Sequence, residues 1–168
     1  MNNEQNSLST SYTYPFFYAL VYKYGIVIAD VLMLSFYLPN LLVIFDKHIY
    51  PQLLFVFILV VLGVFNKFVY NVLKKLPFRI VATEEGLELS KYFLSKRVVT
   101  VLYDEITALE GGYFNRDKFS LSRVYSENSK NDFYYFPKLG GAKQFTALLL
   151  SRVNKELYNE IISKFTQK

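Results

Sequence analysis

The chain has 168 residues, no cysteine and a formal net charge of +5 at pH 7. The absence of cysteine excludes disulfides, thiolate catalysis and metal sites built on cysteine ligands. Most basic residues follow residue 73 and are spread through that part of the chain without a known nucleic-acid-reading motif, so we predict no binding to nucleic acid. This length ordinarily gives one domain, or one small domain with an appendage.

The N-terminal segment, residues 1–17, is rich in Asn, Ser, Thr and Tyr and contains no lysine or arginine. We predict a flexible tail here, which leads into an aromatic approach to a membrane. Amphipathic rings collect at the headgroup level of a bilayer, and tyrosines stand at positions 12, 14, 18, 22 and 24.

Two long apolar runs follow, at residues 24–45 and 50–66, separated by a polar break at residues 46–48. A helix needs roughly 20 mostly apolar residues to cross the hydrocarbon core of a bilayer. Within lipid, the backbone groups of a spanning segment must pair internally. We therefore predict a two-helix transmembrane hairpin over residues 18–76, with helices over residues 24–45 and 51–73.

The charges that flank the two runs predict the orientation of this hairpin. Its outer ends carry Lys23, Lys67, Lys74, Lys75 and Arg79. The tip carries one cation, Lys47, beside a neutral His48. Cations near helix ends collect on the cytoplasmic side, so we predict that both termini are cytoplasmic in a multi-pass protein.

Asp30 is the one charged residue inside the first run, and an ionisable group within a span is costly and often functional. Counted from the shared end of two antiparallel helices, Asp30 and Lys67 lie at similar depth. We interpret them as an intramembrane polar pair that fixes the register of the hairpin. A proton or ion pathway is the alternative. A buried core helix of a soluble protein, or a re-entrant segment broken at Pro39, also stays open.

From residue 77 onward the apolar period changes to two, which indicates β-strands. The predicted strands are residues 78–83, 87–93, 98–101, 103–109, 118–125 and 133–136. Gly-containing and polar segments between them have the composition of turns. Strands at this spacing predict an antiparallel meander that forms a small barrel or sandwich.

Apolar residues at spacings of three or four, from Phe145 to Phe165, then predict one amphipathic helix over residues 142–166. We expect this helix to close the open end of the strands. The alternative is a helix that lies on the membrane surface.

Two segments of this region resemble bacterial pleckstrin-homology-like domains. Residues 78–87, FRIVATEEGL, look like the opening β-hairpin of that family, which follows directly after a pair of membrane helices. Residues 101–106, VLYDEI, are similar to its aromatic-x-x-Ile segment. With the terminal helix, the resemblance extends over residues 18–166.

The resemblance implies an α+β membrane protein: a transmembrane helical hairpin followed by a small antiparallel barrel or sandwich that the C-terminal amphipathic helix closes. It places residues 77–168 as a domain at the cytoplasmic face of a bacterial membrane. It brings no catalytic residues and no cofactor. Eukaryotic relatives of the fold bind phosphoinositides through basic residues in the first strand loops. The corresponding turn here, residues 84–86, is acidic and argues against such binding.

The side chains themselves predict no enzyme and no metal site. The lone His48 lies in the predicted tip and is interpreted as a solvated loop residue. Asp104 and Glu105 are neighbours in a strand, so their side chains point to opposite faces. The sequence contains no Gly-rich phosphate loop, nucleophile elbow or zinc-ligand spacing.

Two sets of residues are candidates for binding. Contacts to anionic headgroups are predicted for Lys74, Lys75, Arg79, Lys96 and Arg97. Lys74 and Lys75 alternatively mark only the end of the second helix. A surface for a protein partner is predicted at Tyr113, Phe114, Tyr134 and Tyr135, because aromatic residues are enriched at interfaces.

The first functional hypothesis is a membrane-anchored, non-catalytic binding or scaffolding protein. Its domain would recruit a protein partner or contact lipid headgroups at the cytoplasmic membrane. The second is a small accessory subunit of a transporter or other membrane complex, which acts through the helical hairpin. The implied partners are membrane lipids and another protein.

Overall fold

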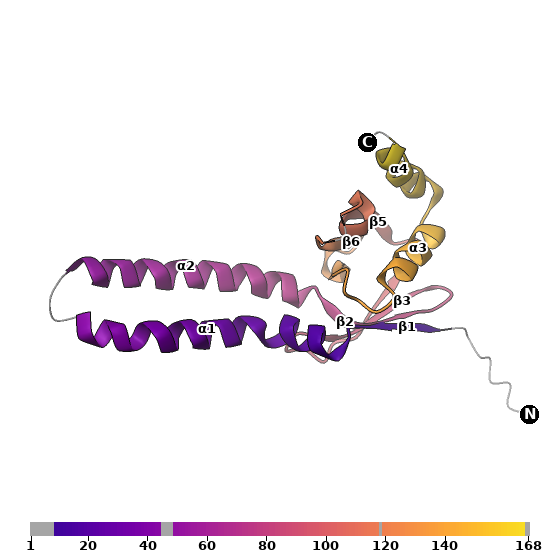
Figure 1. Cartoon of the computed structure of the whole chain (residues 1–168). Coiled ribbons are helices and arrows are strands. Elements are labelled where there is room, and N and C mark those ends of the chain that lie inside the picture. Colours follow the sequence, from indigo (N-terminus) through magenta and orange to yellow (C-terminus); the bar gives the residue numbers. More distant parts are fainter. Residues whose placement is uncertain (1–8, 45–48, 118, 167–168) are drawn as a thin grey trace, which may run out of the picture. The chain divides into compact units, whose positions relative to one another are not determined.

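The computed structural model describes residues 9–44, 49–117 and 119–166 (Figure 1). The chain divides into two compact units, and each is described by itself. One is a helical hairpin, residues Ala19–Leu73. The other, the β-rich unit, contains the described residues up to Tyr18 and those from Lys74 onward.

The two apolar runs form two long helices, as predicted: α1 (Phe16–Ile44) and α2 (Ile49–Lys74). Helix α1 begins earlier than the predicted residue 24, directly after Pro15, whose fixed φ suits a helix start. The helix continues through Pro39, so the alternative of a re-entrant segment broken at that residue is not formed. The predicted tip at residues 46–48 lies outside the described residues.

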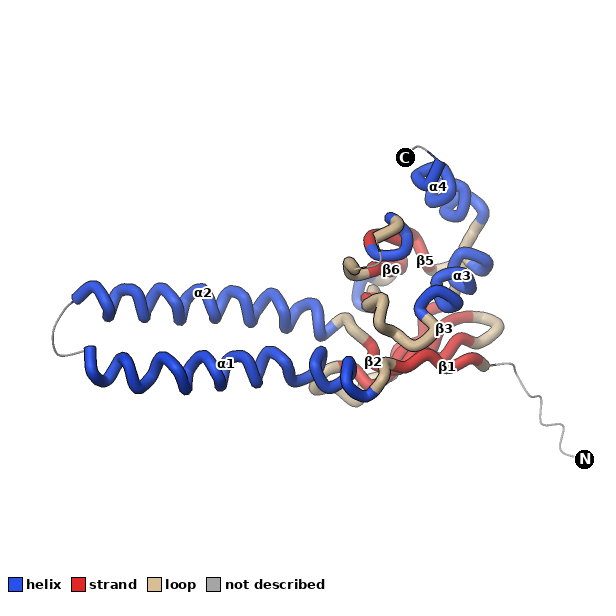
Figure 2. The backbone as a smooth tube through the Cα atoms, in the orientation of Figure 1, coloured by secondary structure: helices blue, strands red, loops and turns tan. Residues whose placement is uncertain are grey.

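The prediction of a flexible tail over residues 1–17 is wrong for its last part. Strand β1 (Thr10–Thr13) pairs with β2 (Pro77–Ala82) in antiparallel register, with Thr10 opposite Ala82 and Thr13 opposite Arg79. Thr and Tyr both favour strands, and Tyr12 is the residue of β1 that is buried. The chain therefore starts the β-rich unit, leaves it for the helical hairpin and then returns to it (Figure 2).

The strands of the described residues form two separate antiparallel sheets. The four-stranded sheet has the order β1-β2-β3-β4, completed by β3 (Gly86–Tyr92) and β4 (Val99–Leu102). The three-stranded sheet is β5 (Ile106–Gly111), β6 (Ser122–Ser126) and β7 (Phe133–Tyr135). The short 3-10 helices are η1 (Gly112–Asn115) and η2 (Ser129–Asn131). The predicted α+β class is confirmed, whereas the sheets do not close into a barrel.

The core of the β-rich unit is formed by the inward faces of both sheets and by α3 (Ala142–Arg152). Phe145 of α3 is fully buried, and its ring centroid lies 5.0 Å from that of Tyr12 and 5.0 Å from that of Tyr135. The buried hydroxyl of Tyr135 is paired with the hydroxyl of Thr146 at 2.8 Å. One helix thus holds β1 and β7, which belong to different sheets.

The single C-terminal helix predicted over residues 142–166 is two helices, α3 and α4 (Lys155–Thr166). Val153 is extended, and the side-chain oxygen of Asn154 accepts a hydrogen bond from the Leu157 amide at 2.8 Å. Asparagine is among the best N-cap residues, so it starts a new helix at this point. Leu157 and Ile161 are nevertheless buried, which explains the uninterrupted apolar spacing.

Candidate functional site

Strand direction places three connections at one end of the four-stranded sheet. Because neighbouring strands are antiparallel, this end holds the exit from β1, the entry to β2 and the β3–β4 loop, residues 93–98. Thr13 lies opposite Arg79, and Pro77 lies opposite Tyr92. Both points at which the chain passes between the β-rich unit and the long helices are therefore at the same end.

The five cations that the sequence singled out as headgroup contacts all belong to this part of the β-rich unit. Lys74 and Lys96 are exposed, and Arg79 is exposed on the outer face of β2. Lys75 and Arg97 are half-buried. We call this region the basic end, defined by Lys74, Lys75, Arg79, Lys96 and Arg97.

Arg97 fixes the β3–β4 loop in place. Its guanidinium lies 4.1 Å from the ring centroid of Tyr92, and it donates a hydrogen bond to the carbonyl of Lys74 at 3.1 Å. Carbonyls in the last turn of a helix lack partners within the helix, and a cation there is favourable. The loop is thus tied to the last residue of α2 by a side chain 23 positions further along the chain.

Lys75 makes two contacts within the β-rich unit that the sequence did not indicate. Its ammonium lies 3.0 Å from the carboxylate of Asp132, which is buried and also accepts a hydrogen bond from the Ser126 amide. The Lys75 carbonyl accepts a hydrogen bond from the Tyr134 amide at 2.9 Å. Burial lowers the pKa of Lys75, but the hydrogen bond and charge of Asp132, with Tyr134, outweigh it and leave that pKa raised. Lys75 therefore joins the two sheets.

The opposite end of the four-stranded sheet is acidic. Glu84 and Glu85 form the β2–β3 turn, and Asp104 and Glu105 follow β4. The amide of Tyr103 donates to the Glu85 carbonyl at 3.3 Å, which brings the two acidic segments together. Charge therefore changes sign along the sheet, from the basic end to the acidic turns.

Only two of the four residues predicted as an aromatic partner surface reach the surface of the β-rich unit. Phe114 and Tyr135 are fully buried in the core, and Tyr113 and Tyr134 are half-buried. The aromatic side chain that the sequence analysis missed is Phe119, which is 91% exposed in the loop before β6. A loop residue in a polar segment has no periodic pattern that would have drawn attention to it.

Within the helical hairpin, Asp30 has a different partner from the one predicted. Its carboxylate accepts a hydrogen bond from the side-chain amide of Asn66 at 2.8 Å. Lys67, which follows Asn66 in the chain, is exposed. The ion pairs found among the described residues are Lys75–Asp132 and Lys164–Glu160. Asp30 thus links α1 to α2 through an uncharged amide.

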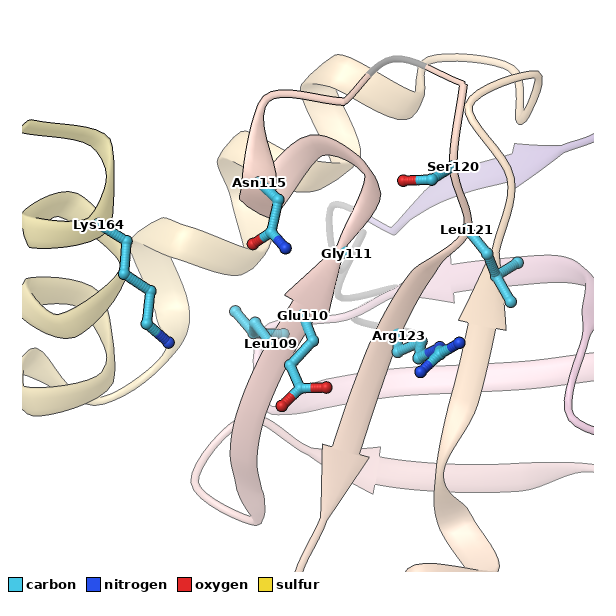
Figure 3. Close-up of a pocket in the computed structure, with 8 residues that line it drawn as sticks. All are labelled: Leu109, Glu110, Gly111, Asn115, Ser120, Leu121, Arg123 and Lys164. Carbon is cyan, nitrogen blue, oxygen red and sulfur yellow. The ribbon is translucent and has the colours of Figure 1, made fainter. Parts of the chain in front are cut away.

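A cavity of about 430 Å³ lies between β5, the segment before β6, and α4 (Figure 3). Glu110 and Arg123 line it from neighbouring strands, and Lys164 lines it from α4. Both signs of charge meet there, because Glu110 is directly opposite Arg123 and Lys164 is paired with Glu160. Among the described residues, no cluster of His, Asp or Glu could hold a metal ion.

No family model, curated protein or solved structure matches this chain.

Tyr92, whose ring packs against Arg97, makes the stability of the β-rich unit fall at alkaline pH. Burial raises the pKa of Tyr92 to about 12, although Arg97 opposes the shift. In the folded state the Tyr92 hydroxyl keeps its proton above the ordinary pKa of 10.0. Its contribution to the free energy of unfolding is therefore complete below pH 10 and is lost as the pH rises toward about 12. The loss attributable to Tyr92 is about 3 kcal/mol.

Urea unfolding of the full chain in detergent over this pH range measures the loss. Tyr92→Phe keeps the ring under Arg97 and is expected to flatten the pH dependence. Burial raises the pKa of Tyr12, Tyr103 and Tyr135 in the same direction, so a smaller slope should remain. Equal pH dependence in the two proteins would contradict the assignment.

Proposed function

We propose that this chain is a membrane-anchored, non-catalytic binding or scaffolding protein of the bacterial cytoplasmic membrane. Its β-rich unit is held at the cytoplasmic face, where it recruits a protein partner or contacts lipid headgroups. The observation that carries the proposal is the basic end. Both passages of the chain to the long apolar helices leave the β-rich unit there, beside cations that suit an anionic leaflet.

The helices support the membrane part of the proposal. Segments Phe16–Tyr37 and Phe55–Lys74 are long and apolar enough to span a bilayer, with mean hydropathies of 1.7 and 2.0. Their side chains are almost wholly unburied, so they are not the core of the described fold. Exposed apolar surface of this extent marks an interaction with a membrane or with other protein.

The flanking charges support the cytoplasmic orientation. The helix ends that join the β-rich unit carry more cations than the tip, and such cations collect on the cytoplasmic side of a membrane. The pleckstrin-homology-like assignment is also part of the proposal. A four-stranded and a three-stranded antiparallel sheet followed by a helix support it, although the sheets stay open. The acidic turn at residues 84–86 joins the second and third strands, so it is not the first strand loop of this unit.

An accessory subunit of a transporter or other membrane complex is the second candidate. It is favoured by the polar pair Asp30–Asn66 inside the apolar helical hairpin. The side-chain oxygen of Asn66 is buried there without a hydrogen-bond partner. Polar side chains within spans commonly bond across helices, so a neighbouring protein could act at this position.

Affinity purification of the full chain from membranes in mild detergent tests the proposal. We expect the chain to resist carbonate extraction and to co-purify with a soluble partner that is lost when residues 77–168 are removed. A partner retained by the truncated chain would favour the accessory subunit. Release by carbonate would overturn membrane anchoring. A single cysteine at Asn159→Cys, in α4, should react with an impermeant maleimide only from the cytoplasmic side.

A further inference from the structure

We propose that the β3–β4 loop, residues 93–98, is a second membrane contact that binds the surface of an anionic bilayer. Leu94 and Val98 enter the interface, and Lys96 and Arg97 meet lipid phosphates. The inference rests on the proposed membrane anchoring and assigns the ligand of the basic end.

The first reason is Leu94, an exposed leucine in a backbone conformation that disfavours it. Its side chain is 78% exposed, so it contributes little to the core. Its backbone has φ 50, in the left-handed region that disfavours a leucine and suits glycine or asparagine. Neither burial nor backbone preference therefore explains leucine at this position. Strained residues that fold stability does not require are found at functional sites.

The second reason is the pattern of the loop. Val98 is also 60% exposed, and it stands with Leu94 on either side of Lys96 and Arg97. Apolar side chains next to cations are the composition of segments that lie in the interface of an anionic membrane. The apolar groups are withdrawn from water while the cations stay with the headgroups.

The third reason is position. The guanidinium of Arg97 is within hydrogen-bonding distance of the carbonyl of Lys74, the last residue of α2. If α2 ends at the bilayer surface, Arg97 lies at the same level. A loop already tethered to the membrane needs only weak intrinsic affinity, because the tether makes its binding intramolecular.

The test uses the full chain in nanodiscs of phosphatidylcholine, with or without phosphatidylglycerol. Because the chain has no cysteine, Leu94→Cys can carry a single environment-sensitive fluorophore. We expect a blue shift and several-fold stronger quenching by spin-labelled lipid in the anionic discs. Phe119→Cys is the matched control, since it is exposed in a loop of the three-stranded sheet. An equally aqueous signal at both positions would overturn the inference.

A label-free measurement excludes an effect of the fluorophore. Hydrogen exchange of residues 93–98 should slow in anionic discs for the natural chain, and this slowing should be lost in Leu94→Asn. Asparagine tolerates the left-handed backbone, so Leu94→Asn should fold at least as stably in detergent. Unchanged protection in Leu94→Asn would contradict lipid insertion. Protection that appears only with a co-purified protein would assign the loop to that protein instead.

These outcomes separate the two proposals. A chain that does not enter nanodiscs refutes membrane anchoring, and the loop inference falls with it. A chain that enters nanodiscs while residues 93–98 respond equally to both lipid compositions refutes the loop inference alone.

Discussion

Replacing Tyr14 with alanine is expected to lower the unfolding free energy of the β-rich unit by about 3–5 kcal/mol, the usual cost of deleting a buried aromatic ring. Tyr14 directly follows β1 and is 6% exposed. Its ring packs edge-on against Phe78, and its hydroxyl accepts a hydrogen bond from the Phe136 amide at 2.8 Å. A residue from before the helical hairpin thus fills the core of a unit that resumes after it.

Urea unfolding in detergent, followed by near-UV circular dichroism and by hydrogen exchange of β3, measures this loss. Tyr14→Phe keeps the ring but leaves the Phe136 amide without its acceptor, so we expect a loss of about 1–3 kcal/mol. Phe119→Ala removes a ring that is exposed, and should change stability by less than about 0.5 kcal/mol. If Tyr14→Ala were as mild as Phe119→Ala, residues 10–14 would not be part of the unit.

The two long helices could be predicted from the sequence because their signal is local: an apolar run needs no knowledge of what packs against it. Strand β1 could not be predicted in this way. It is four residues long, its composition is that of a polar tail, and its partner β2 lies beyond the whole helical hairpin. A strand of that length is specified by its partner strand and by its core contacts, here the contact of Tyr12 with Phe145.

The C-terminal helices show the opposite problem, in which a correct pattern suggested too simple a structure. The apolar residues keep a helical spacing across the break, because α3 and α4 both bury one face in the core of the β-rich unit. The available signal was Asn154, a strong N-cap residue. The aromatic segments at residues 113–114 and 134–135 illustrate a related limit of sequence patterns. Aromatic composition alone does not distinguish a binding surface from a protein core.

The candidate site was partly visible in the sequence. The cations at positions 74, 75, 79, 96 and 97 could be counted, but their position at one end of a sheet depends on strand order and register. The internal use of Lys75 depends on a carboxylate 57 residues further along the chain. Contacts of this range follow from the tertiary fold and have no local signature.

Asp132 is the carboxylate that holds the two sheets together at the basic end, and Asp132→Ala is expected to cost about 2–3 kcal/mol. The substitution removes the ion pair with Lys75 and the acceptor of the buried Ser126 amide. Lys75→Met should cost about 1 kcal/mol or less, because the lysine side chain is 35% exposed and its charge is screened. Its carbonyl still accepts from Tyr134 in that variant.

The double variant Lys75→Met/Asp132→Ala separates the two contributions of Asp132. If Asp132 acts through both partners, the two losses should not add, and the double variant should be about as stable as Asp132→Ala, without the further loss that Lys75→Met causes on its own. Asp132→Asn keeps an acceptor for Ser126 but no full charge, so it should fall between the natural chain and Asp132→Ala. Urea unfolding of the natural chain and the four variants in detergent gives these differences. Strictly additive losses would mean that Lys75 and Asp132 stabilise the sheets independently, and that the 3.0 Å contact contributes nothing of its own.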